Sequence, residues 1–165
     1  MPEALLKDLG PCQITFNSVD LGKTMGGAIF RDSMNQVPVM EDQAGSTPVD
    51  HILTGRNIQV EVPMSRSTLA QLSAVIPGAS SYGSYTVVNN QAGIARAASA
   101  AQLVLKPLVD GVASGDALTI FKASPITDIE LVFDNENQRV YKVLFNVYPD
   151  SDNNNRLYQI GNTVA

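Results

Sequence analysis

The sequence contains one cysteine, one histidine and no tryptophan, and these shortages exclude several classes of protein. A single thiol, Cys12, cannot supply an internal disulfide framework or a zinc site made of several cysteines. Because Cys12 precedes Ile14 and Phe16, we expect it to be a small buried hydrophobe rather than a reactive thiol. Aromatic residues make up 6% of the chain. The tyrosines do not alternate with basic residues, so a stacking platform for single-stranded nucleic acid is not predicted.

Basic residues and long apolar runs are also scarce. The chain has 11 Lys and Arg against 16 Asp and Glu, a net charge of −5, which argues against general affinity for nucleic-acid backbones. The least polar stretch, residues 93–109, is interrupted by Arg96, Gln102 and Lys106, so a membrane span is not expected. The first ten residues lack the apolar core of a signal peptide, so we expect the protein to be made and kept in a cytoplasm.

What the chain does contain is typical of one soluble globular domain. Its 165 residues are 44% hydrophobic and 16% charged, enough for a real core and unlike a disordered chain. No internal repeat is visible. We therefore treat residues 1–165 as a single domain.

Residues 47–79 predict a short helix, a strand and a second helix. Thr47 can be an N-cap, with Pro48 at the first helical position and Gly55 as a stop, so a short helix is expected in between. Next, apolar and polar residues alternate as in a half-buried strand, which we expect Pro63 to end. Its inward residues are Ile58, Val60 and Val62, and its outward residues are Asn57, Gln59 and Glu61.

The second helix is predicted over residues 68–76, and Pro77 and Gly78 should terminate it. Four apolar residues recur at helical spacing and should form its buried stripe. They are Leu69, Leu72, Val75 and Ile76.

The rest of the chain is dominated by strand patterns. Residues 24–30 and 36–42 should form a hairpin around a polar tip at residues 31–35. In residues 126–149, Ile129, Leu131 and Phe133 alternate with Asp128, Glu130 and Val132 before a turn at 134–138, and the return strand follows. Further strands are expected at residues 12–17, 85–88, 102–105, 117–122 and 156–161. These patterns predict a mostly β fold, a β-sandwich or barrel of two packed antiparallel sheets with one flanking α-helix.

Three patterns suggest chemistry, and each is better explained without it. LGKT at residues 21–24 resembles a phosphate-binding loop, but Asn17 stands where that loop needs glycine. DSDNNN at residues 150–155 resembles a calcium loop, but Asn155 stands where glycine is needed and Gly161 where glutamate is needed. His51 follows Asp50, which we assign to helix capping.

Asp128 and Glu130 share one face of a predicted strand, where a solvated surface is the simpler interpretation than a catalytic carboxylate pair. We therefore predict no catalytic, cofactor-binding or metal site and no enzyme.

Three blocks of the sequence resemble the tail tube proteins (major tail proteins) of tailed bacteriophages. They are PCQITFNSVDLGKTMGG, GSTPVDHILTGRNIQVEVPMSRSTLAQLSAVIPGA, and TDIELVFDNENQRVYKVLFNVYPD followed by RLYQIGN. The resemblance runs from about residue 10 to residue 162 and is weakest over residues 80–101. It implies a β-sandwich or barrel that assembles into hexameric rings, which stack into a hollow tube for DNA ejection.

The resemblance also implies a location, partners and two extensions of the domain. The location would be the tail of the virion, after assembly in the host cytoplasm. The partners would be further copies of the chain, a tape-measure protein inside, tail-terminator and baseplate proteins at the ends, and in contractile tails a sheath outside. Genomic DNA would pass through without specific binding, and no membrane or cofactor is implied. The extensions are a hairpin or loop at about residues 31–46 and a C-terminal arm at about 150–165.

Two sets of residues are candidates for these roles. The polar tip is expected to contact the adjacent ring through Arg31, Asp32, Ser33, Met34 and Asn35. Residues that face away from the core are candidates to line the channel, where an acidic surface would let DNA slide. These are Asp32, Glu41, Gln59 and Glu61.

Two other readings stay open. One is a sugar- or receptor-binding β-sandwich on a virion or cell surface, which predicts a small oligomer with clustered exposed aromatic residues. The other is the related tube protein of bacterial type VI secretion, which is equally structural.

Overall fold

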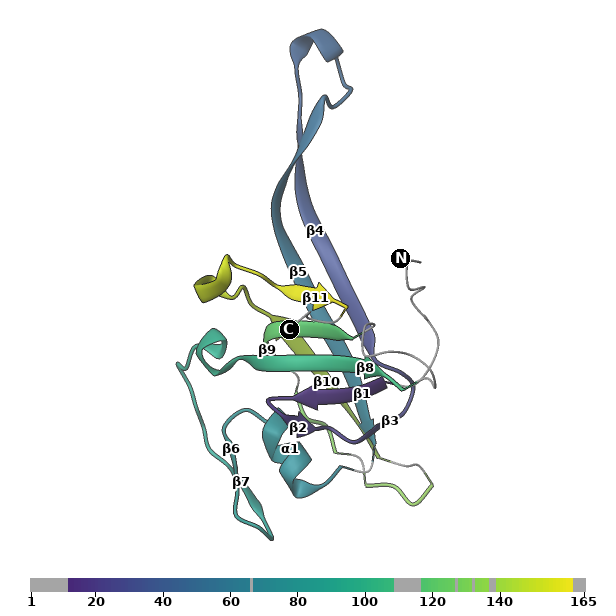
Figure 1. Cartoon of the computed structure of the whole chain (residues 1–165), viewed down its shortest axis with the longest axis vertical. Helices are drawn as coiled ribbons and strands as arrows, with labels where there is room; N and C mark the ends of the chain where they lie inside the picture. Colours follow the sequence, from purple (N-terminus) through teal and green to yellow (C-terminus); the bar gives the residue numbers. More distant parts are fainter. Residues whose placement is uncertain are drawn as a thin grey trace.

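The computed structural model describes residues 12–65, 67–108, 117–126, 128–131, 133–136 and 139–161. Over these residues the protein is mostly β, with one large antiparallel sheet of nine strands, a small sheet of two strands and one short α-helix (Figure 1). The strands are β1 Cys12–Phe16, β2 Val19–Asp20, β3 Lys23–Thr24, β4 Ile29–Val39, β5 Asp50–Ser65, β6 Ala79–Ser81, β7 Thr86–Val88, β8 Ala101–Pro107, β9 Leu118–Pro125, β10 Val140–Val147 and β11 Tyr158–Ile160. The helix α1 is Leu69–Val75.

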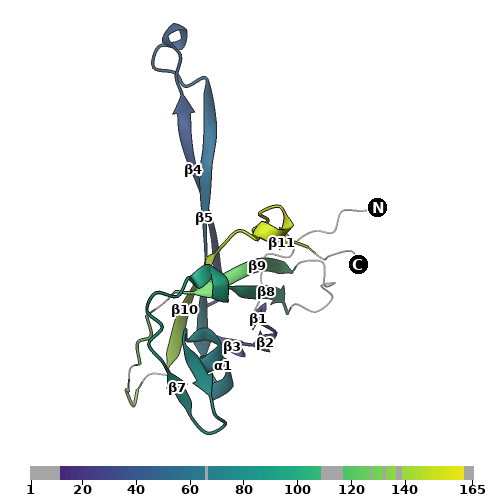
Figure 2. The same cartoon turned by 90° about the vertical axis from the view of Figure 1, so that its left-hand side faces the viewer.

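The large sheet runs in the order β2-β1-β8-β9-β10-β5-β3, with β11 beside β9 and β4 beside β5. One edge of β9 serves two partners, because its first residues pair with β11 and its last, Ala123–Pro125, pair with β10. At this point the sheet changes direction, so that β5 and β10 cross the β1–β8–β9 part at a steep angle (Figures 1 and 2). One continuous sheet therefore supplies both walls of the core.

The core lies between these two parts of the sheet. Ile58, Val60 and Val62 of β5 are buried, while Gln59 and Glu61 between them are only half-buried, as the alternation of the sequence predicts. From the other part, Phe16 of β1 meets Phe145 of β10 with ring centroids 4.9 Å apart. Cys12 is half-buried against this cluster, and burial raises the pKa of its thiol.

The most prominent feature is a long hairpin formed by β4 and β5, whose outer part projects from the body (Figures 1 and 2). The two strands pair continuously from Ile29 with Glu61 to Val39 with Asp50, apart from a bulge at Asn35 and Gln36. At about 3.3 Å per residue, the ten steps from Ile29 to Val39 span about 33 Å. The turn lies at residues 40–49 and contains a short 3-10 helix, Asp42–Ala44.

Two predictions about this region were wrong. Residues 47–55 form no helix, since β5 begins at Asp50 and residues 50–55 pair with β4. A helix of this length has too few hydrogen bonds to offset the cost of nucleation, whereas the strand gains a partner along its whole length. The hairpin tip is also not at residues 31–35, because these lie inside the continuous strand β4.

Pro63 does not end β5, which continues to Ser65 with Pro63 opposite Lys142 of β10. The carbonyl of Pro63 accepts a hydrogen bond from the Met25 amide, on the side where the chain passes from β3 to β4. In a strand the N and the C=O of one residue point to the same side. The missing N–H therefore falls outside the β5–β10 ladder, which stays intact.

The helix α1 begins and ends where the sequence predicts. Thr68 caps it, in a capping box with Gln71, and Gly78 follows it with a φ of 79°. The expected buried stripe is only partly present: Val75 is buried, Leu72 and Ile76 are half-buried, and Leu69 is exposed. With seven residues, α1 makes fewer than two full turns. A helix this short places few side chains against the core, and Leu69 at its start remains outside.

The predicted C-terminal hairpin was also wrong in its first half. Ile129, Leu131 and Phe133 belong to no strand and are exposed. The return strand, β10, pairs instead with β5 along its whole length and with the end of β9. That pairing buries Val143, Phe145 and Val147.

The strand expected at residues 24–30 was wrong, because residues 25–28 lie in no strand and separate β3 from β4. The strands expected at residues 12–17, 85–88, 102–105, 117–122 and 156–161 are confirmed with small shifts of their ends. Residues 80–101, where the resemblance is weakest, contain the β6–β7 hairpin and a 3-10 helix, Arg96–Ser99. The predictions for residues 1–11, and the turn expected at residues 109–116, lie outside the described residues.

Candidate functional site

The outer part of the β4–β5 hairpin carries a set of exposed apolar side chains, which we call the arm surface. Its members are Met34, Val37, Met40, Val49, Ile52 and Leu53, each between 46% and 58% exposed. They lie on both strands and near the turn, so burial in the protein's own core does not account for them. Apolar patches of this kind on a soluble domain mark sites where another surface binds.

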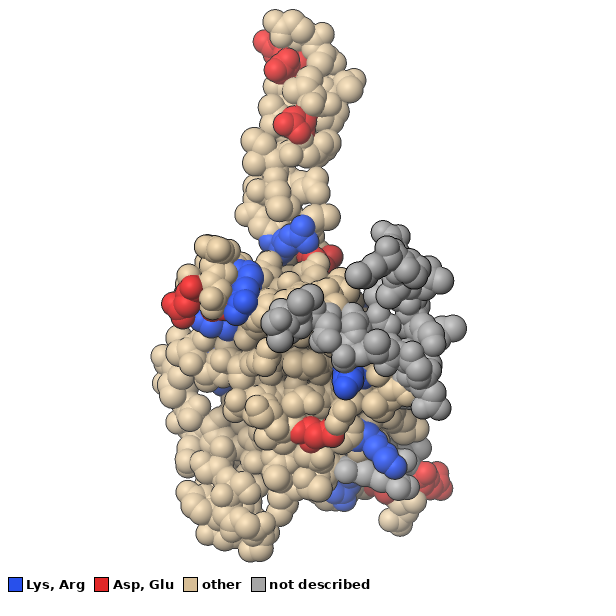
Figure 3. All heavy atoms as spheres, viewed as in Figure 1, with Lys and Arg blue, Asp and Glu red and all other residues tan. Residues whose placement is uncertain are grey.

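The charge on the same segment has one sign. Residues 33–55 contain no Lys or Arg, and their acidic residues Glu41, Asp42 and Asp50 lie at or next to the turn. Between the acidic tip and the base lies an uncharged part of the hairpin, residues 33–40 and 51–55, which we call the shaft. Figure 3 shows the acidic groups toward the end of the hairpin and the other charged groups at its base, with the shaft between them. The shaft is therefore apolar and neutral, and the tip is acidic.

A polar cluster, which we call the base clasp, joins the hairpin to the C-terminal segment. The Tyr158 hydroxyl of β11 donates to Asp32 Oδ2 at 2.8 Å, and the Arg56 guanidinium bonds the same oxygen at 2.5 Å. Tyr158 also packs edge-on against Phe30, with ring centroids 5.0 Å apart. The hydrogen bond to Asp32, more than burial, raises the pKa of Tyr158. β11 thus holds the hairpin where it leaves the body.

The loop between β10 and β11 is organised around one buried carboxylate. Asp150 accepts hydrogen bonds from Asn153 Nδ2 at 2.8 Å and Arg156 Nε at 3.2 Å, and Lys122 Nζ lies 3.4 Å away. The Asn153 hydrogen bond is the largest of several causes that lower the pKa of Asp150. Arg156 also lies over the ring of Phe121, 3.9 Å from its centroid. This loop is a polar connection, as the sequence predicts, and it places β11 against the hairpin.

The four channel candidates do not lie together. Gln59 and Glu61 share one face of β5, where Glu61 is 3.7 Å from Arg31. Asp32 is opposite the buried Ile58, and directly opposed residues of an antiparallel pair point to the same face, so Asp32 lies on the core side. Glu41 lies beyond β4, at the turn of the hairpin. With Arg31 beside Glu61, the outward face of β4 and β5 is polar but not strongly acidic.

The five expected stacking residues lie side by side within β4 rather than at a tip. Asp32 belongs to the base clasp and Arg31 to the ion pair with Glu61. Met34 is part of the exposed arm surface, while Ser33 and Asn35 pair with Asn57 and Gly55 of β5. The projecting part is further along the chain than predicted.

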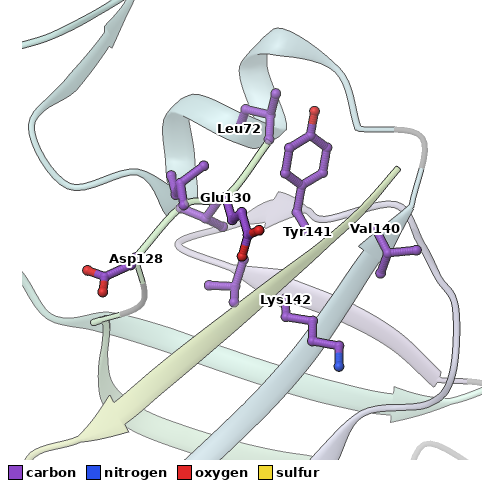
Figure 4. A pocket seen from close by; sticks show the side chains of 9 residues that line it. Leu72, Asp128, Glu130, Val140, Tyr141 and Lys142 are labelled. Atoms are coloured by element: carbon purple, nitrogen blue, oxygen red, sulfur yellow. The ribbon is translucent and has the colours of Figure 1, made fainter. Parts of the chain in front are cut away.

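A groove lies at the other end of β5, and we call it the end groove. It has a volume of about 360 Å³ and is formed by α1, β10 and residues 128–130 (Figure 4). Its lining residues are Leu72, Val75, Asp128, Ile129, Glu130, Val140, Tyr141, Lys142 and Val143. Apolar side chains thus alternate with two acids and one lysine. Asp128 and Glu130, the carboxylates noted in the sequence, are exposed beside this groove.

The arm surface is a feature that the sequence reading missed. One signal was present: Met34, Val37, Met40, Val49, Ile52 and Leu53 occur in a segment without any Lys or Arg. The second site feature, the base clasp, had no local signal, because Tyr158 and Asp32 are 126 residues apart.

The described part of the chain shows no group of three or more His, Cys, Asp and Glu side chains able to hold a metal ion. Its single α-helix is too short to cross a membrane, and no other described helix could do so. In the LGKT segment, Leu21 and Gly22 connect β2 to β3, and Lys23 and Thr24 form β3. His51 lies in β5, exposed and opposite Pro38.

The comparisons with known proteins give no family. No protein-family model matches the chain, and no curated protein matches its sequence.

Proposed function

We propose that this protein is a structural subunit of a bacteriophage tail tube, which assembles with copies of itself into stacked rings. The arm surface carries this proposal. A projecting hairpin with exposed apolar side chains on both strands and no cation has the chemistry of an assembly element rather than of a catalytic site. The mostly β domain and the resemblance of three sequence blocks to tail tube proteins support the same function.

The unpaired edges of the hairpin support assembly for a second reason. Among the described strands, residues 50–58 of β5 pair only with β4, and β4 pairs only with β5, so the outer edges of the hairpin offer backbone hydrogen-bonding groups. Exposed strand edges invite pairing with further chains, and assembly is one way to cover them. In the proposed tube, six subunits form a ring and rings stack along the axis, where the contacts repeat without closing.

The channel wall in this proposal is the outward face of β4 and β5, with Gln59 and Glu61. A strongly basic wall would bind DNA through released counterions and slow its passage. The ion pair of Glu61 with Arg31 leaves this face polar with little net charge, a surface on which DNA can slide. The virion tail is the corresponding location, and the tube ends and the tape-measure protein are the corresponding partners.

The test is assembly of the purified full-length chain. At high concentration we expect rings or tubes with a central hole under negative-stain electron microscopy, or hexamers by size exclusion with light scattering. A variant in which residues 36–54 are replaced by Asn-Gly serves as the control, because such a turn can join Asn35 to Gly55 and remove every member of the arm surface except Met34. It should fold, with a circular dichroism spectrum still typical of strands and a cooperative thermal transition, and fail to form tubes. A wild-type chain that stays monomeric at all concentrations would contradict the proposal.

One observation favours a surface-binding module as the second candidate. Tyr82 and Tyr85 beside the β6–β7 hairpin are 59% and 56% exposed and stack with centroids 5.3 Å apart. Stacked exposed aromatic rings are common in sugar-binding and protein-binding surfaces. Loss of all binding to host cells or glycans in a Tyr82→Ala variant, together with a monomeric wild type, would favour this candidate.

A further inference from the structure

We infer that the end groove is the receiving site for the arm surface of another copy of the same chain. This inference deepens the proposed function and rests on it, because it names the partner surface for axial stacking. It commits to one occupant, the neutral shaft of the hairpin, through the face that carries Val37 and Ile52, which are directly opposite each other.

The first argument is the position of the two surfaces on one strand. β5 has 16 residues, which at about 3.3 Å each span about 50 Å. Its start, Asp50, pairs with Val39 beside the hairpin turn, and its end, Ser65, pairs with Val140 at the end groove. The arm surface and the end groove thus lie at opposite ends of the molecule along one direction (Figure 1). Copies related by a shift along this direction bring one hairpin to the next groove.

The second argument is that both surfaces are apolar and uncovered. In the groove, Val75 and Val143 are buried, while Ile129 is 45% exposed. Leu131 and Phe133 continue the exposed apolar surface along the same segment, at 47% and 74%. Two apolar surfaces that meet remove each other's area from water at roughly 25 cal/mol per Å². Arg139 lies over the ring of Phe133, 4.3 Å from its centroid, but the described residues otherwise leave these apolar side chains exposed, and the next subunit would cover them.

Charge decides which part of the hairpin fits. Asp128 and Glu130 line the groove and outnumber the one cation among its lining residues, Lys142 (Figure 4), so the acidic tip with Glu41 and Asp42 would be repelled there. The shaft has no charged side chain and meets no such penalty. The shaft therefore lies in the groove, and the tip extends past it.

A strand edge at the groove completes the fit. β10 pairs with β5 through Val140–Asn146. On its other side Phe145–Val147 pair with β9, and the Leu144 carbonyl accepts a hydrogen bond from the Ile126 amide. No described strand pairs with that side of Val140–Lys142, so this part of β10 offers an edge to an extended segment, and an edge strand from a hairpin is such a segment. The contact joins two different surfaces, so it repeats along an axis without closing.

Two variants allow the contact between the arm surface and the end groove to be tested by itself. Each variant lacks one of the two surfaces, so neither can form chains through this contact. In the groove copy, residues 36–54 are replaced by Asn-Gly, so the end groove stays and only Met34 of the arm surface remains. In the arm copy, Ile129→Glu places a carboxylate in the groove against the neutral, apolar shaft, while the hairpin stays. Ile129 is exposed, so this substitution should leave the fold intact, which circular dichroism and thermal melting check.

Each variant alone should lack this contact, and an equimolar mixture should form a heterodimer by native mass spectrometry. Placing Ile129→Glu in the groove copy as well should raise the concentration for half-maximal heterodimer about tenfold or more, which corresponds to at least about 1.4 kcal/mol. The matched control is Ile160→Glu in the groove copy. Ile160 is 60% exposed on β11, away from the groove, so this change should leave the heterodimer unaffected.

Cross-linking then identifies the contact. In a Cys12→Ser background, Ile52→Cys in the arm copy and Val140→Cys in the groove copy should be joined by a short bismaleimide. Ile160→Cys in place of Val140→Cys should give little product. A covalent dimer from arm copies carrying only Ile52→Cys would instead show hairpin-to-hairpin pairing and overturn the inference.

The outcomes separate this inference from the proposed function. Tubes from the wild type without a heterodimer from the two variants would refute the groove assignment and leave the tube. A heterodimer with no tube from the wild type would support the groove and refute the tube. Absence of both would refute both.

Discussion

Removal of one hydroxyl from the base clasp, by Tyr158→Phe, should loosen the hairpin without unfolding the domain. The substitution deletes the 2.8 Å hydrogen bond to Asp32 Oδ2 and keeps the ring that packs on Phe30. Asp32 Oδ1 is buried without a partner, so Arg56 alone would then hold the carboxylate. A hydrogen bond to a charged group contributes about 1.5–3 kcal/mol. Since Tyr158 is only half-buried, we expect the lower value, about 1.5 kcal/mol.

The assay is amide hydrogen exchange followed by mass spectrometry. A loss of about 1.4 kcal/mol in local stability corresponds to about tenfold faster exchange, which should appear in β11 and in the base of the hairpin at residues 30–33 and 56–60. The matched control is Tyr82→Phe, because that hydroxyl belongs to an exposed ring stacked on Tyr85. Unchanged exchange in the Tyr158→Phe variant would refute the clasp.

Alkaline pH gives an independent check of the same contact. The hydrogen bond to Asp32 raises the pKa of Tyr158 above its ordinary value near 10. A raised pKa means that the folded state holds the phenol proton more tightly than the unfolded state does. This contribution to stability is complete below the unfolded pKa and is lost as the pH rises through the folded one. The wild type should lose more stability above pH 10 than Tyr158→Phe does.

Three further substitutions or conditions test the fold. Gly78→Ala should cost at least about 1–2 kcal/mol, since φ is 79° and a Cβ would lie 2.6 Å from the Asn89 carbonyl oxygen; urea unfolding that matches the wild type would contradict this. Val75→Ala should lower the free energy of unfolding by about 2 kcal/mol, whereas Leu69→Ala, at an exposed site, should stay within about 0.5 kcal/mol; equal effects would show that the helix packs differently. The contacts of Asp150 lower the pKa of its carboxyl, so their contribution to stability is present above the unfolded pKa and lost as the pH falls through the folded one. Hydrogen exchange in the loop at residues 151–156 should therefore rise at low pH in the wild type and be already fast in Asp150→Asn.

The sequence predicted elements whose signals are local. The alternation of Ile58, Val60 and Val62 with polar neighbours identified the inner half of β5, because a half-buried strand repeats every two residues. The helical spacing of apolar residues and the stop at Gly78 likewise located α1, whose N-cap in the structure is Thr68. Each of these signals lies within a few residues of the structure that it specifies.

Local signals failed where a distant partner decided the structure. Thr47, Pro48 and Gly55 satisfy the rules for a short helix, yet residues 50–55 become strand because β4 pairs with them. Ile129 and Leu131 alternate like a strand but belong to none, because β10, the strand expected to pair with them, pairs with β5 and β9. A sequence pattern gives the conformation that a segment favours, and the pairing of strands selects the conformation that it adopts.

The same limit applies to the candidate site. Asp32 was expected on the outside because it is charged, but its register opposite Ile58 turns it toward the core side, where Arg56 and Tyr158 surround it. The register of a hairpin cannot be read from one strand, since a shift of one residue exchanges the two faces. Gln59 and Glu61 were placed correctly relative to the core because their own strand carries the alternation.

If the arm surface binds the end groove, the polymer has two different ends, and each should be blocked by a different variant. One end presents free hairpins and the other presents free grooves, since the contact joins unlike surfaces. The groove copy can cover a free hairpin but then presents no hairpin of its own. A small fraction of groove copies added to wild-type chains should therefore stop growth at hairpin ends, and arm copies should stop it at groove ends. Tube lengths in electron micrographs should fall with either variant, although each one alone leaves the opposite end growing. They should fall further when both variants are added, because both ends are then blocked. If the two variants together shorten tubes no more than either one alone, the polymer does not have the two unlike ends that this contact requires.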